Sequence, residues 1–162
     1  MGCVFTVECY VTQRRSEMGI PSCTCDSCKA MCSRPCYATP RDAERLIRAG
    51  FADRLRMENS YDYETYVISP AFKGREGIDD RASDWANRQG CTFQDKDGLC
   101  ELHDLGLKPL EARLVIHNEH PLSKKTPLSL HDRIVDLWKT NRGRRTIELL
   151  QQKRKEPNHV LD

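Results

Sequence analysis

Residues 23–36, CTCDSCKAMCSRPC, and residues 91–103, CTFQDKDGLCELH, hold seven of the nine cysteines of the chain. Zinc and iron–sulfur sites need several thiolates within a few ångströms of one another. A Cys-x-x-Cys unit such as Cys25 and Cys28 supplies two thiolates from a single turn, and a second block elsewhere in the sequence supplies the others. The grouped cysteines therefore predict a metal site.

The second block has the pattern of a β-hairpin. We read GCTF and LCEL as short strands on either side of the turn DKDG at residues 95–98, because Asp-Gly favours the positive backbone dihedrals of a tight turn. Such a hairpin would bring Cys91 and Cys100 close together. His103 lies three residues after Cys100 and adds a Cys-x-x-His unit.

Two other interpretations of the cysteines are a disulfide framework and unliganded buried thiols. The cysteine count is odd, no secretory signal precedes the first block, and 162 residues are enough for an ordinary core without covalent cross-links. These observations favour metal ligation and predict a cytoplasmic protein with reduced thiols.

Composition predicts one soluble domain, residues 1–162, with 38% hydrophobic and 31% charged residues and a net charge of +2. We expect no membrane span, because the chain has no run of eighteen apolar residues. The first residues, MGCVFT, match a myristoylation pattern with Cys3 available for a second acyl group. Such short patterns arise easily by chance, and we favour instead a strand over residues 4–11, in which Cys3 and Cys9 are ordinary buried thiols.

Local patterns predict an α+β fold: a small, irregular, metal-stabilised domain with short strands or a hairpin and about four helices. A helix is expected over residues 39–50, where Thr39 is the N-cap, Pro40 takes the first helical position, Asp42 completes a capping box, and Ala43, Leu46 and Ile47 form one apolar stripe. Further helices are expected over 51–57, over 144–155 and over 129–143, the last burying Leu130, Ile134, Leu137 and Trp138. A strand is expected over residues 63–68, followed by a long surface loop over 69–90.

The helical C-terminal segment, residues 128–156, is basic. From Lys139 to Lys155 the chain has seven basic residues and one acidic residue. Such a run is usually a solvated helix face, so nucleic-acid binding is the less favoured interpretation.

The motifs CDSCKAMCSRPC and CTFQDKDGLCELHDLGLKPLEAR resemble a family of zinc- or iron-chelating cysteine-cluster proteins, described by the pattern CxxCxxCC, over residues 23 to about 117. This chain lacks the adjacent cysteine pair of that pattern and has Ala112 where many members have a cysteine. The resemblance implies that the ligands are Cys25, Cys28, Cys32, Cys36, Cys91, Cys100 and His103.

With Cys23, the seven grouped thiols and His103 make eight donors, enough for two four-coordinate zinc sites. We expect zinc, with an iron–sulfur cluster as the alternative, because the spacings match neither common ferredoxin pattern. His117 and His120 are further candidate ligands, although such a pair is more often polar surface.

The expected function is that of a metal-binding structural or interaction module whose unknown protein partner meets the 69–90 loop or the basic helix. The alternative is an iron–sulfur protein with a redox or methyl-transfer activity, since a related cysteine pattern occurs in flagellin lysine methylases. The chain shows none of the common nucleotide-binding or hydrolase motifs, so enzyme activity is left open and no catalytic residue is assigned. We expect residues 99–113 to form a lid over the metal site, with a tight bend at Gly106 and a short helix that begins at Pro109.

Overall fold

The structure, a computed structural model, describes residues 26, 29, 36–79, 90–114 and 127–156. Within these residues the elements are α3 (Pro40–Arg48), the 3-10 turn η1 (Ala52–Arg54), β1 (Leu55–Asn59), β2 (Tyr66–Pro70), α4 (Leu110–Leu114), α5 (Pro127–Trp138) and α6 (Asn141–Lys155). The expected α+β fold, with about four helices and short paired strands, is confirmed for the part of the chain that the structure describes, although the paired strands are β1 and β2 and not the hairpin expected around residues 95–98. The expected strand over residues 4–11 lies outside it.

Helix α3 begins at the residues whose types favour a helix start, as predicted from the sequence. The Asp42 N–H donates to Thr39 Oγ1 at 3.1 Å, which confirms Thr39 as the N-cap, and Pro40 follows in the first turn. Gly50 has a φ of +88°, a left-handed conformation that ends the helix at little cost for glycine. The side chains of Ala43, Leu46 and Ile47 are buried, as the apolar stripe predicts.

The expected helix over residues 51–57 is wrong. Only Ala52–Arg54 make a helical turn, and Leu55–Asn59 form β1, which pairs antiparallel with β2 in the register Leu55↔Pro70 to Asn59↔Tyr66. The sequence LRMEN contains good helix formers, but cross-strand pairing overrides this weak local preference. Arg56 and Glu58 are buried together, with their side chains 2.9 Å apart.

The strand expected at residues 63–68 begins and ends later, at Tyr66–Pro70. Beyond it, the expectation of a surface loop over 69–90 is wrong for the first residues: Ser69, Ala71 and Phe72 are buried. Residues 80–89 lie outside the described part of the chain.

The break between the two C-terminal helices falls earlier than expected. Helix α5 ends at Trp138, and Thr140 caps α6 by accepting the Gly143 N–H at 3.3 Å. Gly143 therefore lies inside the first turn of α6 and does not end α5. A Cβ at Gly143 would lie 2.3 Å from the Trp138 carbonyl oxygen, so the tight corner between the helices requires glycine here.

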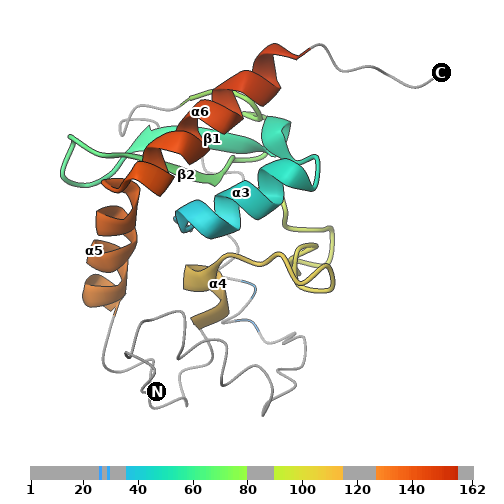
Figure 1. The fold of residues 1–162 in the computed structure, drawn as a ribbon. Helices are drawn as coiled ribbons and strands as arrows, with labels where there is room; N and C mark the ends of the chain where they lie inside the picture. The colour runs from blue at the N-terminus through green and yellow to red at the C-terminus, as the bar shows by residue number, and fades with distance from the viewer. Residues whose placement is uncertain (1–25, 27–28, 30–35, 80–89, 115–126, 157–162) are drawn as a thin grey trace, which may run out of the picture.

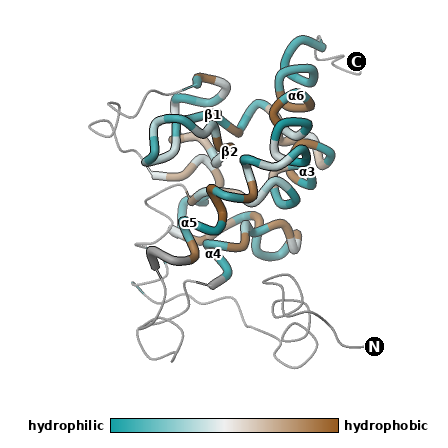
Figure 2. Tube along the Cα trace, turned by 60° about the vertical axis from the view of Figure 1, so that its left-hand side comes forward, coloured by the Kyte–Doolittle hydropathy of each residue, from teal (hydrophilic) through white to brown (hydrophobic). Residues whose placement is uncertain are grey.

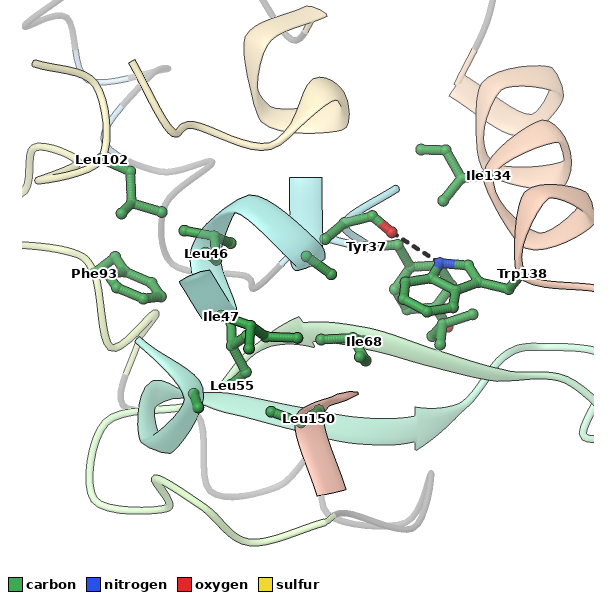
Figure 3. Close-up of a cluster of buried hydrophobic side chains, with 14 of the residues drawn as sticks. Tyr37, Leu46, Ile47, Leu55, Ile68, Phe93, Leu102, Ile134, Trp138 and Leu150 are labelled. Carbon is green, nitrogen blue, oxygen red and sulfur yellow. Dashed lines mark hydrogen bonds between the residues drawn. The ribbon is translucent and has the colours of Figure 1, made fainter. Parts of the chain in front are cut away.

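The core lies between the hairpin and the helices. In Figure 1, α6 crosses the β1–β2 hairpin with α3 beside it, and α4 lies next to α3 on the side away from α6. Both α3 and α6 carry apolar and polar residues, as the hydropathy colouring of Figure 2 shows. Figure 3 shows the cluster between these elements, with the Trp138 indole donating to the Ala38 carbonyl at 2.8 Å. Its labelled members include Leu46, Ile47, Leu55, Ile68, Phe93, Leu102, Ile134, Trp138 and Leu150.

The expected burial along α5 holds only in part. Ile134 and Trp138 are buried and Leu130 is half-buried, but Leu137 is 42% exposed and Val135 is buried instead. No helix in the described ranges is long and apolar enough to cross a membrane.

Candidate thiol site

Half of the eight predicted ligands belong to the described part of the chain. These are Cys36, immediately before the α3 cap, and Cys91, Cys100 and His103 in the second block. Cys23, Cys25, Cys28 and Cys32 lie outside the described residues, as do Cys3, Cys9, His117 and His120. The structure therefore places ligand candidates from both blocks.

The tight turn of the second block is confirmed. Asp95 Oδ1 accepts the N–H groups of Asp97 and Leu99, each at 2.8 Å, and Gly98 has a φ of +82°. The flanking strands are shorter than expected: Gln94 pairs with Cys100 in an isolated bridge, while Cys91 pairs with Phe72 just beyond β2. Cys91 and Cys100 thus do not face each other as strand partners, because the backbone of Cys91 is used to join β2.

Three thiols, Cys36, Cys91 and Cys100, form what we call the thiol cluster. None of the three forms a disulfide in the described structure. Burial raises the pKa of Cys36 well above its usual value, and Glu111, Cys91 and Cys100 raise it further. Burial also raises the pKa of Cys91 to about 12, with a further contribution from Cys100. The thiols are thus close enough for the negative charge of one to oppose ionisation of the next.

The first cysteine block meets the second at Lys29, which follows Cys28 in the chain. The Gln94 side-chain amide donates to the Lys29 carbonyl oxygen at 3.1 Å. A Cβ at Gly98 would lie 3.4 Å from the Lys29 side chain, so the DKDG turn packs against this residue. The two blocks are therefore neighbours in the fold although more than sixty residues separate Lys29 from Gln94.

A metal needs more donors than the described residues bring together. Within the described part of the chain, no three His, Cys, Asp or Glu side chains are arranged to hold a metal ion. The thiol cluster nevertheless fits part of a thiolate site, since its members form no disulfide in the described structure and their charges oppose one another's ionisation. Cys25, Cys28 and Cys32 are the predicted ligands that would complete it.

Helix α4 holds the backbone next to Cys36. The Ala112 N–H donates to the Cys36 sulfur, and Glu111 Oε2 accepts the Tyr37 N–H at 2.6 Å. Asp42 Oδ2 accepts the Leu110 N–H at 2.9 Å. The carboxylate of the α3 capping residue therefore also positions α4, a second use that the capping pattern does not predict.

The segment expected to act as a lid has the predicted bends. Gly106 has a φ of +65°, its carbonyl accepts from Arg45 at 2.9 Å, and α4 begins directly after Pro109. His103 lies half-buried in the turn after Cys100, with its N–H donating to the Cys100 carbonyl at 3.0 Å. The lid function and the His103 ligand role remain predictions.

His131 was not among the predicted site residues. Its Nδ1 lies 3.0 Å from Glu111 Oε1, and its ring stacks on Tyr37 at 4.3 Å and near Tyr61 at 5.6 Å between ring centroids. The hydrogen bond to Glu111 raises the His131 pKa. No sequence spacing connects residues 37, 111 and 131, so a pattern search has no signal for this contact.

Several basic side chains of α6 are used within the molecule. Arg142 pairs with Glu44 at 3.0 Å, and Arg154 pairs with Asp79 at 2.7 Å while donating to the Leu55 carbonyl. Arg154 and Asp79, whose carboxylate also accepts the Met57 N–H, together cover the outer edge of β1. These contacts show that part of the basic run serves the fold.

Comparison of the chain with protein families, with curated proteins and with solved structures found no match. The resemblance to the cysteine-cluster family therefore stays a prediction from the motifs.

Proposed function

We propose that the protein binds a metal ion, with zinc preferred, through the thiol cluster and cysteines of residues 23–32. The observation that carries this proposal is that Cys36 of the first block is electrostatically coupled to Cys91 and Cys100 of the second, while Lys29 of the first block packs against the turn of the second. The metal would serve the structure, as in small interaction modules that rely on zinc for part of their folding free energy.

The raised pKa values of the thiol cluster are consistent with a site for a cation, because a cation would stabilise the thiolate form. Burial and mutual repulsion raise the pKa of Cys36 and Cys91, so these groups are neutral thiols at neutral pH in the absence of metal. A bound Zn²⁺ replaces the thiol protons and neutralises part of the resulting thiolate charge, which removes the repulsion. We therefore expect metal binding to release protons and to strengthen as pH rises.

Elemental analysis of purified protein tests the proposal. Native protein should hold stoichiometric zinc, whereas Cys36→Ser and Cys100→Ser should hold less and melt at lower temperature. Cys9→Ser is the matched control, since Cys9 lies outside both blocks, and it should keep the full metal content. Native protein without stoichiometric metal, or full occupancy in both cluster variants, would refute the proposal.

The same sample distinguishes zinc from an iron–sulfur cluster. Zinc–thiolate protein is colourless, whereas an iron–sulfur cluster absorbs visible light and brings iron and acid-labile sulfide. We expect a colourless sample. A brown sample that contains iron would refute zinc binding and support the alternative, an iron–sulfur protein with a redox or methyl-transfer activity.

We also propose that the protein works in a reducing compartment such as the cytoplasm. Freshly isolated, denatured and metal-stripped chain should then take up alkylating reagent at all nine cysteines without reductant, as mass spectrometry can count. Two or more native disulfides would contradict this compartment.

A further inference from the structure

We propose that the turn between β1 and β2, together with the neighbouring part of α5, is a surface through which two copies of this chain associate about a two-fold axis. We call this surface the tyrosine tip; its members are Tyr61, Asp62, Tyr63, Glu64, Tyr66, Asp132, Asp136 and Leu137. The inference goes beyond metal binding and is independent of it, because none of these residues belongs to the thiol cluster.

Exposed apolar side chains gather at this end of the molecule. Of the six large hydrophobic residues that are exposed in the described part of the chain, four belong to the tyrosine tip, namely Tyr61, Tyr63, Tyr66 and Leu137. The Tyr61 hydroxyl donates to Asp132, and Asp62 pairs with Lys139 at 3.4 Å, so the turn lies against α5 (Figure 1). Exposed tyrosines grouped in this way are typical of protein–protein interfaces.

Tyr63 is poorly suited to the turn itself. Its φ is +57°, the one positive φ of a non-glycine residue in the described structure, and this conformation is strained for a bulky side chain. The residue is 73% exposed, and its hydroxyl has no hydrogen bond among the described residues. Glycine or asparagine would form the same turn with less strain. The tyrosine therefore contributes something other than the fold, and its exposure makes it available to another molecule.

The tyrosine tip is acidic, and the adjacent start of α6 is basic. Across residues 60–66 and 130–139 four acidic side chains exceed two basic ones, whereas residues 141–145, NRGRR, include three arginines and no acidic residue. Lys139 connects the two surfaces, because its Nζ pairs with Asp62 and its carbonyl oxygen accepts from Arg144 at 3.1 Å. Surfaces of opposite charge thus lie side by side on one molecule.

Two adjacent surfaces of opposite charge are complementary to themselves about a two-fold axis. In a copy turned by 180°, the acidic surface of each chain faces the basic surface of the other, and the contact closes after two copies. Glu64 and Arg145 are exposed, and neither side chain has an ion pair within the described part of the chain. Arginine also binds the faces of exposed tyrosine rings. A second copy therefore supplies the cationic partner that the tyrosine tip favours.

Sedimentation velocity of the full chain is the first test. We expect a weak dimer with a Kd of about 10–100 µM, because stable interfaces bury about 800 Å² on each partner and the tip offers only a few large side chains. The affinity should fall as salt is raised. Reductant in the sample prevents intermolecular disulfides from imitating the dimer. A protein that stays monomeric up to about 1 mM, or that forms open-ended oligomers, would overturn the proposal.

Tyr63→Asn separates a role in association from a role in the fold. The variant should raise the dimer Kd by about tenfold or more, and its melting temperature should stay equal or rise, because asparagine tolerates the left-handed conformation. Leu105→Ser is the matched control: Leu105 is 57% exposed and lies outside the tip, so neither quantity should change. A lower melting temperature with an unchanged Kd would assign Tyr63 to the fold and refute its role here.

Charge reversal tests the two-fold arrangement. Glu64→Lys and Arg145→Glu should each weaken dimerisation about tenfold, because like charges then meet at both contacts of the dimer. An equimolar mixture of the two variants should associate with near-native affinity, because opposite charges meet again at both contacts. A mixture as weak as the separate variants would show that the tip and α6 do not face each other. Monomeric native protein whose Tyr63 NMR signals shift with hexa-arginine would assign the tip to a different cationic partner and overturn dimerisation.

Discussion

Two regions of the molecule are stabilised in different ways. The core half, comprising α3, β1, β2, α5 and α6, buries Trp138, Leu46, Ile68 and other large side chains almost completely. The thiol half, comprising Cys36 and residues 90–114, has isolated bridges, turns and the five-residue helix α4. Apolar burial is enough to explain the first region. The second has few regular backbone pairs, which is the situation in which a bound metal contributes most.

The halves share part of the apolar core and are joined by several polar contacts. Phe93 and Leu102 of the thiol half reach the same apolar cluster as Leu46, Asp42 of α3 binds α4, and Arg54 of η1 pairs with Glu101. We expect a perturbation of one half to weaken the other in part. The predictions below test that separation.

Metal removal should have the largest effect on stability, and the loss of stability should be confined mostly to the thiol half. Structural zinc contributes on the order of 10 kcal/mol to folding in small zinc peptides, although a chain with its own core depends on it less. After chelation, we expect the amides of Asp95 and Glu101, which bond across the turn, to lose hydrogen-exchange protection. Amides of α3 and α6 should keep most of theirs.

Equal loss of protection in α6 and in residues 90–103 would contradict this picture. It would mean that the chain folds as one cooperative unit that depends on the metal throughout.

Trp138→Ala should have the next largest effect, and it should fall on the core half. The side chain is 2% exposed and its indole donates to the Ala38 carbonyl, so we expect a loss of about 3–5 kcal/mol in urea unfolding. Leu137→Ala, at the neighbouring and 42% exposed position, is the control and should cost far less. Similar losses in both variants would show that α5 does not pack as described.

Gly143→Ala should destabilise the corner between α5 and α6 by about 1–3 kcal/mol, because the new methyl group would overlap the Trp138 backbone. Thermal unfolding measures the change. Arg145→Ala lies in the same helix with an exposed side chain, so it should stay within about 0.5 kcal/mol of the native protein. A neutral Gly143→Ala would mean that the corner can open without loss.

The sequence allowed prediction where the signal is local. The cap, Pro40 and apolar stripe of α3 lie within one short segment, and so does the DKDG turn, and both are confirmed. The helix predicted over residues 51–57 was wrong at Leu55–Met57, because their strand depends on pairing with β2, which local propensity does not encode. The helix break at residues 139–140 was misplaced because Gly143 was taken as a helix end, whereas it allows the close approach to the Trp138 backbone inside the first turn of α6.

The candidate site, like the fold, could be predicted from the sequence only where its pattern is local. Cysteine spacing identifies possible ligands, since two thiols per turn is a local pattern. The Glu111 contacts with Tyr37 and His131 join residues 74 and 20 positions apart, and no periodicity connects them. Contacts of this kind become visible only in the folded chain.

The smallest expected effect concerns the turn that joins β1 to β2, at the far end of the core half. Asp62 accepts hydrogen bonds from Ser60 Oγ at 2.5 Å and from the Thr65 and Glu64 N–H groups at 2.9 and 3.0 Å. These bonds, with that of Ser60 foremost, hold the pKa of Asp62 well below its usual value. Their stabilising effect is therefore complete above the unfolded pKa, about 3.9, and is lost as pH falls through the lower folded pKa.

Asp62→Asn should cost about 1 kcal/mol or less at neutral pH, since the exposed turn is well solvated and the amide oxygen keeps part of the bonding. In urea unfolding followed from pH 7 to pH 2, the difference between native protein and variant should shrink on the acidic side of about pH 4, because protonation removes the same charge from the native turn. Glu64→Gln, an exposed neighbour, is the control and should show no such convergence. A constant difference across this range would mean that the Asp62 charge does not stabilise the turn, and the β1–β2 end of the core half would then depend on strand pairing alone.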